Sequence, residues 1–319
     1  MATNPYIELS HFTGINNIAD SKSLNSDFNT GKGADLVSCV NVNIDNDGII
    51  HRRDGVTSIN GTSTHSLYAN KNGTIILYMQ GTTLYSGIGS DKHALRIGLA
   101  VDLPMYYAEI GDNIIYSNGQ IIEYTLDGFT SISFRTQFDI NQSYSPLTNK
   151  EPMLAGTMLQ AHNERLYVVN NNTIYYSDAM NFVSMDKENY YLLVDDAITM
   201  FISVVDGFWV SYGGNTYFID GNRPQGIGLD PLDFVIKPKS NHKALGQAVI
   251  VDALTLGVQT QGKTTVAWLG TKGVVVGDNV GMMYPLSIDR YQLNGNVVSA
   301  VTLFKQTAGQ AYLINCTNT

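Results

Sequence analysis

The chain has little charge and few cysteines, prolines and tryptophans for its length of 319 residues. It contains two cysteines, eight prolines and two tryptophans, and 15% of its residues are charged. Two cysteines exclude a disulfide framework and a cysteine-rich zinc site. The low charged fraction is atypical of helical bundles, which draw on Glu, Lys, Leu and Ala. No run approaches the roughly 20 apolar residues that a membrane span needs, and the N-terminus shows no secretory signal. We therefore expect a chain that folds in a cytoplasm with free thiols.

The charge that is present is mostly acidic. The 19 Lys and Arg residues face 28 Asp and Glu residues, which gives a formal net charge of −9. A protein that coats phosphates needs a basic surface, so this balance argues against a nucleic-acid binder. The 30 glycines and 19 tyrosines favour a β-rich chain with many tight turns. The length fits two ordinary domains or one large all-β domain.

Short alternating apolar runs are separated by turn residues along most of the chain. Asn-Gly and Gly-Gly pairs supply the positive φ angles of hairpin turns, so each such segment predicts a β-hairpin. The predicted hairpins span residues 74–87, 109–124, 164–178, 206–221 and 263–278.

The hairpins recur at a spacing that suits a β-propeller. Equivalent positions in successive hairpins are Tyr85, Tyr124, Tyr176, Tyr217 and Val275. Propeller blades of four strands occupy about 40 to 50 residues, so the pattern predicts an all-β propeller of five to six antiparallel blades. A β-sandwich or a pair of jelly rolls is the alternative.

The sequence predicts two regions outside the blades and no long amphipathic helix. Residues 1–33 are polar and irregular and predict an extended N-terminal arm, which leaves 34–319 for the propeller. Residues 220–242 carry three prolines and predict a long loop between blades. Cys39 and Cys316 lie near the two ends of the chain and would be neighbours if the terminal strands pair, although free buried thiols explain them equally.

Motifs for metals, nucleotides and catalysis are weak. Residues 43–48 resemble a calcium loop, but their flanks read as strands rather than helices, so a β-turn explains them. The six histidines show no paired spacing, and no nucleotide-binding or nucleophile motif is present, so we expect no cofactor and no metal. A glycosidase would need two carboxylates facing a central channel. The available carboxylates, which fit turn caps better, are Asp178, Asp195, Asp196, Asp206 and Asp220.

Aromatic side chains and one arginine pair are the remaining candidates for binding. Trp209 and Tyr212 are candidate platforms for a glycan, and so are the pairs Tyr106-Tyr107 and Tyr190-Tyr191. Packing inside the strands or between blades explains these aromatics better. Arg52 and Arg53 could hold a carboxylate or phosphate, or form salt bridges to a neighbouring blade or subunit.

Several segments together resemble a known family. The opening FTGINNIADSKSL, followed by CVNVNIDNDGIIHRRDG, resembles the start of β-propeller structural proteins of tailed bacteriophages. HNERLYVVNNNTIYYSDAMN, DGFWVSYGGNTYFIDG and TTVAWLGTKGVVVGDNVGMMYPLSIDRY are similar to later segments of those proteins. The resemblance covers about residues 12–291. It is closest in kind to the nozzle type, although nozzle proteins are commonly longer and carry extra domains.

The resemblance implies a non-enzymatic structural component of the virion, in the tail or the head–tail region, that is assembled in the host cytoplasm. Its partners would be other virion proteins and further copies of the same chain, and phage DNA would pass it transiently. An acidic surface would keep that DNA from adhering. The residues expected to bind partners are Phe12, Asn16, Asn17, Arg52 and Arg53. The alternative is a receptor- or glycan-binding propeller at the tail tip, which would use Trp209 and Tyr212.

Overall fold

The computed structural model describes most of the chain between residues 64 and 287 and shorter segments on either side. The described residues are 12–18, 34–36, 38, 42–44, 49–52, 64–87, 89–101, 103–144, 148–186, 188–220, 235–252, 264–287, 293, 299–307 and 310–318.

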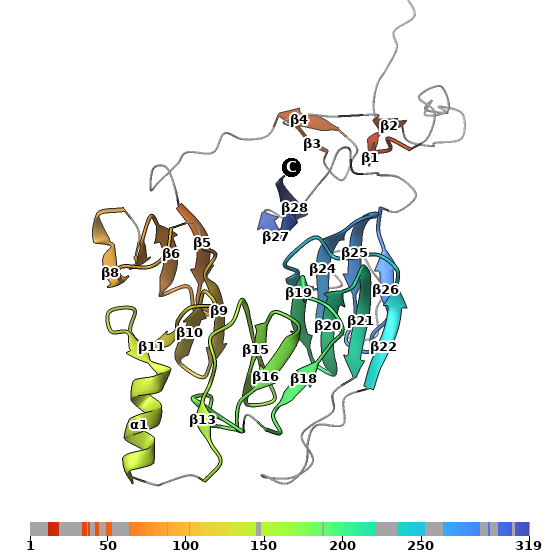
Figure 1. Ribbon diagram of the computed structural model, residues 1–319. Helices are drawn as coiled ribbons and strands as arrows, with labels where there is room; N and C mark the ends of the chain where they lie inside the picture. The colour runs from red at the N-terminus through yellow and green to blue at the C-terminus, as the bar shows by residue number, and fades with distance from the viewer. Residues whose placement is uncertain are drawn as a thin grey trace, which may run out of the picture.

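Five four-stranded antiparallel sheets, here called blades 1 to 5, form the body of the described chain (Figure 1). Blade 1 contains β5 (Thr64–Ala69), β6 (Ile76–Gln80), β7 (Thr83–Ser86) and β8 (His93–Arg96). Blade 2 contains β9 (Tyr106–Ile110), β10 (Asn113–Ser117), β11 (Ile122–Thr125) and β12 (Ile132–Ser133). Blade 3 contains β14 (Met158–His162), β15 (Arg165–Asn170), β16 (Thr173–Tyr176) and β18 (Tyr191–Leu193). Blade 4 contains β19 (Met200–Val204), β20 (Gly207–Tyr212), β21 (Asn215–Asp220) and β22 (Val235–Ser240). Blade 5 contains β23 (Val249–Asp252), β24 (Thr264–Gly270), β25 (Gly273–Gly277) and β26 (Met283–Pro285).

The remaining elements of the described residues are pairs of strands and two helices. The strand pairs are β1 (Phe12–Ile15) with β2 (Ala34–Leu36), β3 (Val42–Ile44) with β4 (Ile50–Arg52), β13 (Glu151–Pro152) with β17 (Ser184–Met185), and β27 (Ser299–Thr307) with β28 (Gln310–Asn318). The helices are a 3₁₀ turn, η2 (Gly89–Asp91), and α1 (Phe134–Tyr144).

The blades are arranged radially, so the predicted β-propeller is confirmed and the sandwich alternative is wrong. Neighbouring blades meet through their first strands, since β14 contacts both β9 and β19. The five predicted hairpins all form, with turns at or next to the expected residues. Gly81 and Gly213 adopt φ angles of 60° and 54° in two of these turns, a region that glycine enters without a steric penalty.

The hydrophobic core lies between blades rather than within one central layer. Leu77 and Met79 of blade 1 pack with Ile114 of blade 2, and Trp209 of blade 4 packs with Trp268 of blade 5. The same holds at the junctions of blades 2 and 3 and of blades 3 and 4. Each of these blades therefore buries its apolar faces against its neighbours, which a single four-stranded sheet cannot do alone.

Hydroxyl side chains connect the blades where each sheet begins. Ser66 Oγ accepts a hydrogen bond from the amide of Met105 at 2.9 Å, and Ser211 Oγ accepts one from Ala244 at 2.9 Å. Ser117 Oγ bonds both the amide and the carbonyl of Gly156, at 3.0 and 2.8 Å. These bonds satisfy main-chain groups that leave the regular ladders, as buried polar groups require.

The structure differs from the sequence prediction at two elements. Residues 134–144 form helix α1, although no such helix was expected; Phe134 and Phe138, one turn apart, are its buried residues. The predicted loop over 220–242 is wrong in its last part, because Val235–Ser240 is strand β22. Pro238 is tolerated there because β22 is the outer strand of its blade and needs hydrogen-bond donors on one side.

The predicted N-terminal arm lies largely outside the described residues. Within it, β1 pairs in parallel with β2, which belongs to the expected propeller region. Asn16 donates to Asp35 at 3.2 Å across this pair. Cys39 is also outside the described residues, and Cys316 is a residue of β28. The boundary between arm and propeller at residue 33 remains a prediction.

Candidate functional site

A buried carboxylate lies at the junction of blades 1 and 2. Glu123, on β11, is 6% exposed. Its carboxylate receives hydrogen bonds from Ser131 Oγ at 2.5 Å and Tyr116 Oη at 3.1 Å, and Arg96 Nε of β8 lies 3.3 Å away. Charge-assisted bonds of this kind stabilise an ionised carboxylate in a buried position. Glu123 thus ties the outer strand of blade 1 to blade 2.

The hydroxyl groups around Glu123 serve as donors. Burial raises the pKa of Tyr116 above its usual value, and Glu123 acts in the same direction, while the bond to Ser131 and the charge of Arg96 oppose it. Tyr116 therefore remains protonated at neutral pH and its Oη also contacts Ser131 Oγ. The carboxylate of Glu123 thus faces two hydroxyl donors, Ser131 and Tyr116, and the guanidinium of Arg96.

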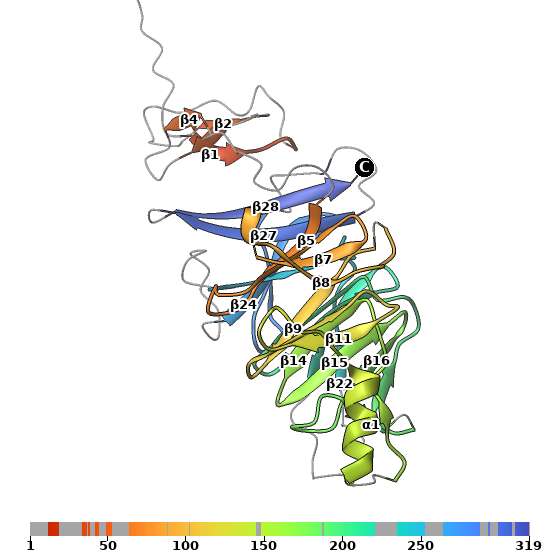
Figure 2. The same cartoon turned by 90° about the vertical axis from the view of Figure 1, so that its left-hand side faces the viewer.

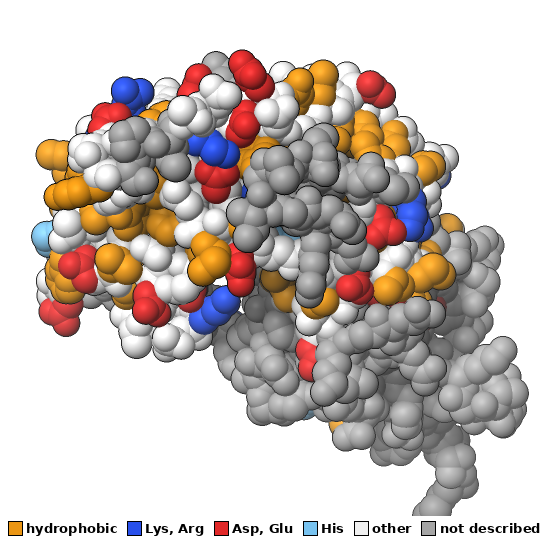
Figure 3. Space-filling view, turned by 90° about the horizontal axis from the view of Figure 1, so that it is seen from below, with side chains coloured by type: hydrophobic (Ala, Val, Ile, Leu, Met, Phe, Trp, Pro, Cys, Tyr) orange, Lys and Arg blue, Asp and Glu red, His pale blue; other side chains and the backbone are white. Residues whose placement is uncertain are grey.

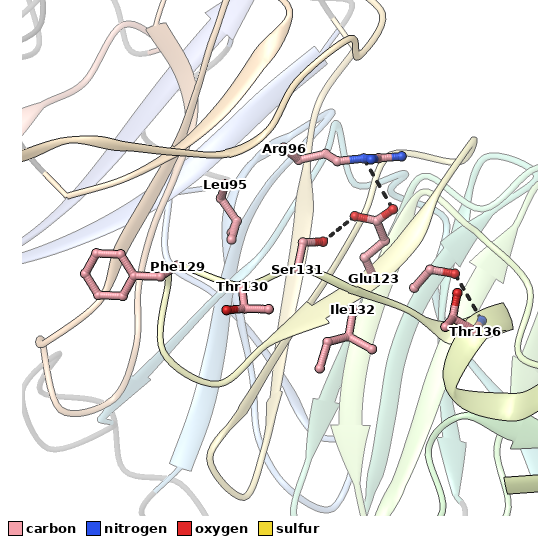
Figure 4. Close-up of a pocket in the computed structure, with 9 residues that line it drawn as sticks. Leu95, Arg96, Glu123, Phe129, Thr130, Ser131, Ile132 and Thr136 are labelled. Atoms are coloured by element: carbon pink, nitrogen blue, oxygen red, sulfur yellow. Dashed lines mark hydrogen bonds and ion pairs between the residues drawn. The ribbon is translucent and has the colours of Figure 1, made fainter. Parts of the chain in front are cut away.

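A pocket of about 580 Å³ opens beside this cluster (Figure 4). Its walls combine apolar side chains with hydroxyl groups and one ion pair. The lining residues are Leu95, Arg96, Glu123, Phe129, Thr130, Ser131, Ile132, Ser133 and Thr136. They include one carboxylate, Glu123, and that carboxylate is already hydrogen-bonded. A pair of carboxylates flanking a substrate, as glycoside hydrolysis requires, does not line this pocket.

The loop that presents Phe129 to this pocket is held by Asp127. Asp127 Oδ1 accepts hydrogen bonds from the amides of Phe129 and Thr130, both at 2.8 Å. These main-chain bonds lower the pKa of Asp127. Phe129 itself is 66% exposed, and its carbonyl lies 3.2 Å from His93 Nε2 of β8. An ordered loop therefore displays a phenyl ring to solvent.

Two other exposed apolar side chains lie just after β8 and just before Asp127 in the sequence. Ile97, which follows Arg96, is 69% exposed, and Leu126 is 52% exposed. Figure 3, viewed from the α1 side, shows hydrophobic side chains gathered on the side of the molecule where blades 1 and 2 lie. We call Ile97, Leu126 and Phe129 the rim surface.

The aromatic platforms proposed from the sequence are wrong for Trp209 and Tyr212. Trp209 is 0% exposed and donates from Nε1 to the carbonyl of Asp278 at 2.9 Å. Tyr212 is 6% exposed and stacks on Tyr217 with ring centroids 4.2 Å apart. Burial raises the pKa of Tyr212 to about 12. Both are core residues, because a propeller blade is covered on both faces, and neither offers a ring to a glycan.

The aromatic pairs Tyr106-Tyr107 and Tyr190-Tyr191 are also mostly engaged in packing. Tyr107 stacks on Tyr68 at 4.8 Å, and its hydroxyl donates to the carbonyl of Ser66 at 2.9 Å. Tyr190 is buried and stacks on Tyr176 at 4.9 Å, whereas Tyr191 is exposed on the outer strand of blade 3.

The candidate carboxylates fall into separate places rather than one site. Asp178 forms an ion pair with Lys150 at 2.7 Å, and Asp220 forms one with Lys237 at 2.5 Å. Asp196 accepts from the amide of Ala197 at 2.7 Å, which is a turn contact. Asp195 is exposed and Asp206 is half-buried. Among the described residues, no group of three or more His, Cys, Asp or Glu side chains could hold a metal ion.

The residues expected to bind partners are partly described. Arg52 is exposed on β4, and Phe12 is a residue of β1, which contacts β3. Asn16 and Asn17 follow β1 and are half-buried. Arg53 and the turn residues 45–48 lie outside the described residues, and β3 and β4 pair as the predicted hairpin requires.

The cluster of Arg96, Glu123, Ser131 and the exposed Phe129 was missed by sequence reasoning. The turn signal Asp127-Gly128 before Phe129 marks the loop, but nothing in the sequence shows that the next residue is exposed. Within the described part of the chain, no helix has the length and apolar character that a membrane crossing needs.

Comparison with known proteins finds distant likenesses among solved structures. No family model matches the chain, and no curated protein matches it. Among solved structures, the extracellular domain of the putative one-component system BT4673 from B. thetaiotaomicron is similar, with 11% identity and a TM-score of 0.47 over 85% of this chain and 33% of that chain. BBS1N, solved in complex with ARL6DN, gives 12% identity and a TM-score of 0.47 over 84% of this chain and 81% of its own. YCF48 from Cyanidioschyzon merolae gives 9% identity and a TM-score of 0.45 over 77% of this chain and 75% of its own. This chain spans about a third of the BT4673 chains that it matches.

Proposed function

We propose that the chain is a non-enzymatic structural protein that acts through protein–protein contacts in the virion of a tailed bacteriophage, in the tail or head–tail region. The rim surface carries this proposal. Phe129 is exposed on a loop held by Asp127, and Ile97 is exposed directly after β8. Exposed apolar side chains of this kind gain free energy when a partner covers them, at about 25 cal/mol per Å².

The rigidity of the rim supports the same function. Asp127 fixes the loop and the Arg96–Glu123 ion pair fixes the strand beside it. A surface that is already ordered loses little conformational entropy when it binds. Partners of this kind would be other virion proteins or further copies of the chain in a homo-oligomer. The net charge of −9 would prevent adhesion to DNA passing through such an assembly.

The test is incorporation of rim variants into particles. In the phage that encodes the chain, the double variant Ile97→Ser/Phe129→Ser should reduce the amount of this protein in purified particles at least tenfold, measured by quantitative mass spectrometry. Val205→Ser is the matched control, because Val205 is 61% exposed on a different blade. Wild-type incorporation of the rim variant, or absence of the wild-type protein from particles, would overturn the proposal.

A second candidate function, glycan or receptor binding at a tail tip, is favoured by the exposed Phe129 beside a pocket with hydroxyl groups. Aromatic rings next to hydrogen-bonding groups are suited to sugars. A glycan array with the purified protein would show saturable binding that Phe129→Ala removes and Thr136→Ser retains. Binding to virion proteins without any glycan signal would favour the structural function.

A further inference from the structure

The hairpin β27–β28 occupies the sixth position of the ring. Figure 1 draws it between β5 of blade 1 and β24 of blade 5, Figure 2 shows the same hairpin from the side, and it contacts β23 and β24 of blade 5. It therefore lies in the gap between the last blade and the first. Among the described strands, however, this sheet has two strands where the other five positions have four.

The inner edge of this sheet is already occupied. The amide of Ala300 donates to the carbonyl of Leu245 at 2.8 Å, and the amide of Thr302 donates to Gln247 at 3.3 Å. Thr302 Oγ1 also accepts from the amide of Leu269 at 3.1 Å. Because β27 is bonded to blade 5 on one side and to β28 on the other, the sheet can grow only beyond β28.

The register of the β27–β28 hairpin determines which main-chain groups lie along the free edge of β28. Ala300 pairs with Thr317 and Thr302 pairs with Asn315. Since the amides of Ala300 and Thr302 point away from β28, these are non-hydrogen-bonded pairs, and the main-chain groups of Thr317 and Asn315 point away from β27. Alternation extends this row to Leu313 and Ala311. The row is a template for another strand.

The chain contains a second two-stranded hairpin that could supply the third and fourth strands of this sheet. β3 and β4 form a two-stranded antiparallel sheet of their own. In a complete blade the fourth strand leads into the first strand of the next blade, and β4 leads into β5, the first strand of blade 1. The segments that join a fourth strand to the next first strand between four-stranded blades include 97–105, 194–199 and 241–248.

The segment from β4 to β5, residues 53–63, is close to these in length. When extended it reaches roughly 40 Å, which is ample to connect neighbouring blades. Both hairpins are also marginal alone, because a two-stranded sheet rarely satisfies itself in water.

We infer that the β3–β4 hairpin of the same chain adds to β28 and completes a sixth blade, with β3 beside β28 and β4 outermost. The ring is then closed by strands from both ends of the chain. Arg52, on β4, would lie on the outer edge of this blade, where it is accessible to a partner. This inference concerns closure of the fold and does not depend on the proposed function.

Disulfide trapping tests it. In a background with Cys39→Ser and Cys316→Ser, Asn43→Cys on β3 is combined with a single cysteine at each position from 311 to 318 of β28. Adjacent strands bring opposite Cα atoms to about 4.5–5.5 Å, within the limit of about 7 Å for a disulfide. The matched control is His51→Cys on β4, which faces Asn43 across the hairpin. It would lie about 10 Å from β28, beyond that limit.

We expect an intramolecular disulfide at one or two β28 positions with Asn43→Cys, formed at least tenfold more than with His51→Cys, read by non-reducing gels and peptide mapping. Disulfides that form only between two chains would overturn the inference, because a second copy would then be the occupant. Absence of any bond across the eight positions, in variants that keep the wild-type melting temperature, would overturn it as well.

Discussion

His162 lies at the junction of blades 3 and 4 and is buried as a neutral ring. It belongs to β14, and its imidazole packs against Phe208 of β20 with ring centroids 4.7 Å apart. Burial lowers the pKa of His162 to about 4, while the charge of Asp206 opposes the shift. A charged imidazolium is disfavoured there because the aromatic surroundings replace water.

This shift predicts a loss of stability in mild acid. The folded pKa lies below the unfolded value of 6.5, so the stabilisation is fully present above pH 6.5 and is lost as pH falls toward 4. The expected loss from His162 is on the order of 2 kcal/mol between pH 7 and pH 5. Denaturant unfolding of wild type and His162→Gln at both pH values measures it. An equal pH dependence in the two proteins would show that His162 does not contribute.

Residue burial was predicted only in general terms: packing was the favoured role of the aromatic side chains, yet Trp209 and Tyr212 were kept as glycan candidates. Alternation along a strand separates an inward from an outward side, but in a propeller blade both sides face other blades. Trp209 and Tyr212 are therefore buried, as are all residues of their strand, Gly207–Tyr212. Glu123 could not be recognised either, because its partner Arg96 is on another blade.

Elements pack against each other closely at the junction of blades 4 and 5. The indole of Trp209 on β20 lies over Gly277, the last residue of β25. A Cβ placed on Gly277 would come within 2.5 Å of Trp209 Cε2. Since the ring is held by its bond to Asp278 and by Trp268, it cannot move aside without disturbing both blades.

Gly277→Ala should therefore destabilise the protein by about 2 kcal/mol or more, seen as a melting temperature several degrees lower. Gly270→Ala on β24 is the control, because a Cβ there meets neighbours no closer than 3.5 Å. Trp209→Phe removes the part of the ring that clashes, so the double variant should lose less than the two single losses combined. If the losses of stability in the two single variants simply add in the double variant, the contact between residue 277 and Trp209 is not the cause of the destabilisation.

Local signals predicted some elements and failed for others. Each central hairpin was predictable because its turn residues, such as Gly213 and Gly214, carry the geometry themselves. Helix α1 was not, because few of its residues are apolar and it depends on contacts with β11, β12 and β13. β22 was obscured by Pro238, which only an outer strand accepts.

At the scale of the whole molecule, the ring was predictable from the sequence, and its closure by the terminal strands remains a prediction. Spacing of the hairpins is a property of the sequence, so it indicated the number of blades within one. Pairing between strands near opposite ends of the chain depends on contacts that no local pattern encodes. The pairing of β1 with β2 could not be predicted either, and among the described elements it too is a two-stranded sheet.

The N-terminal arm offers the last prediction, which separates assembly from folding. Deletion of residues 1–33 removes β1 but keeps the hairpin β3–β4, which begins at Val42. If β1 and its neighbours bind other virion proteins, this truncation should keep the wild-type melting temperature and yet be absent from purified particles, as measured by mass spectrometry. Deletion of residues 1–60 is the contrasting variant, because it also removes the hairpin that we assign to the sixth blade, and it should melt at a lower temperature. Normal incorporation of the shorter truncation would refute a role of the arm in assembly, since a free energy of binding that depends on the arm cannot survive its removal.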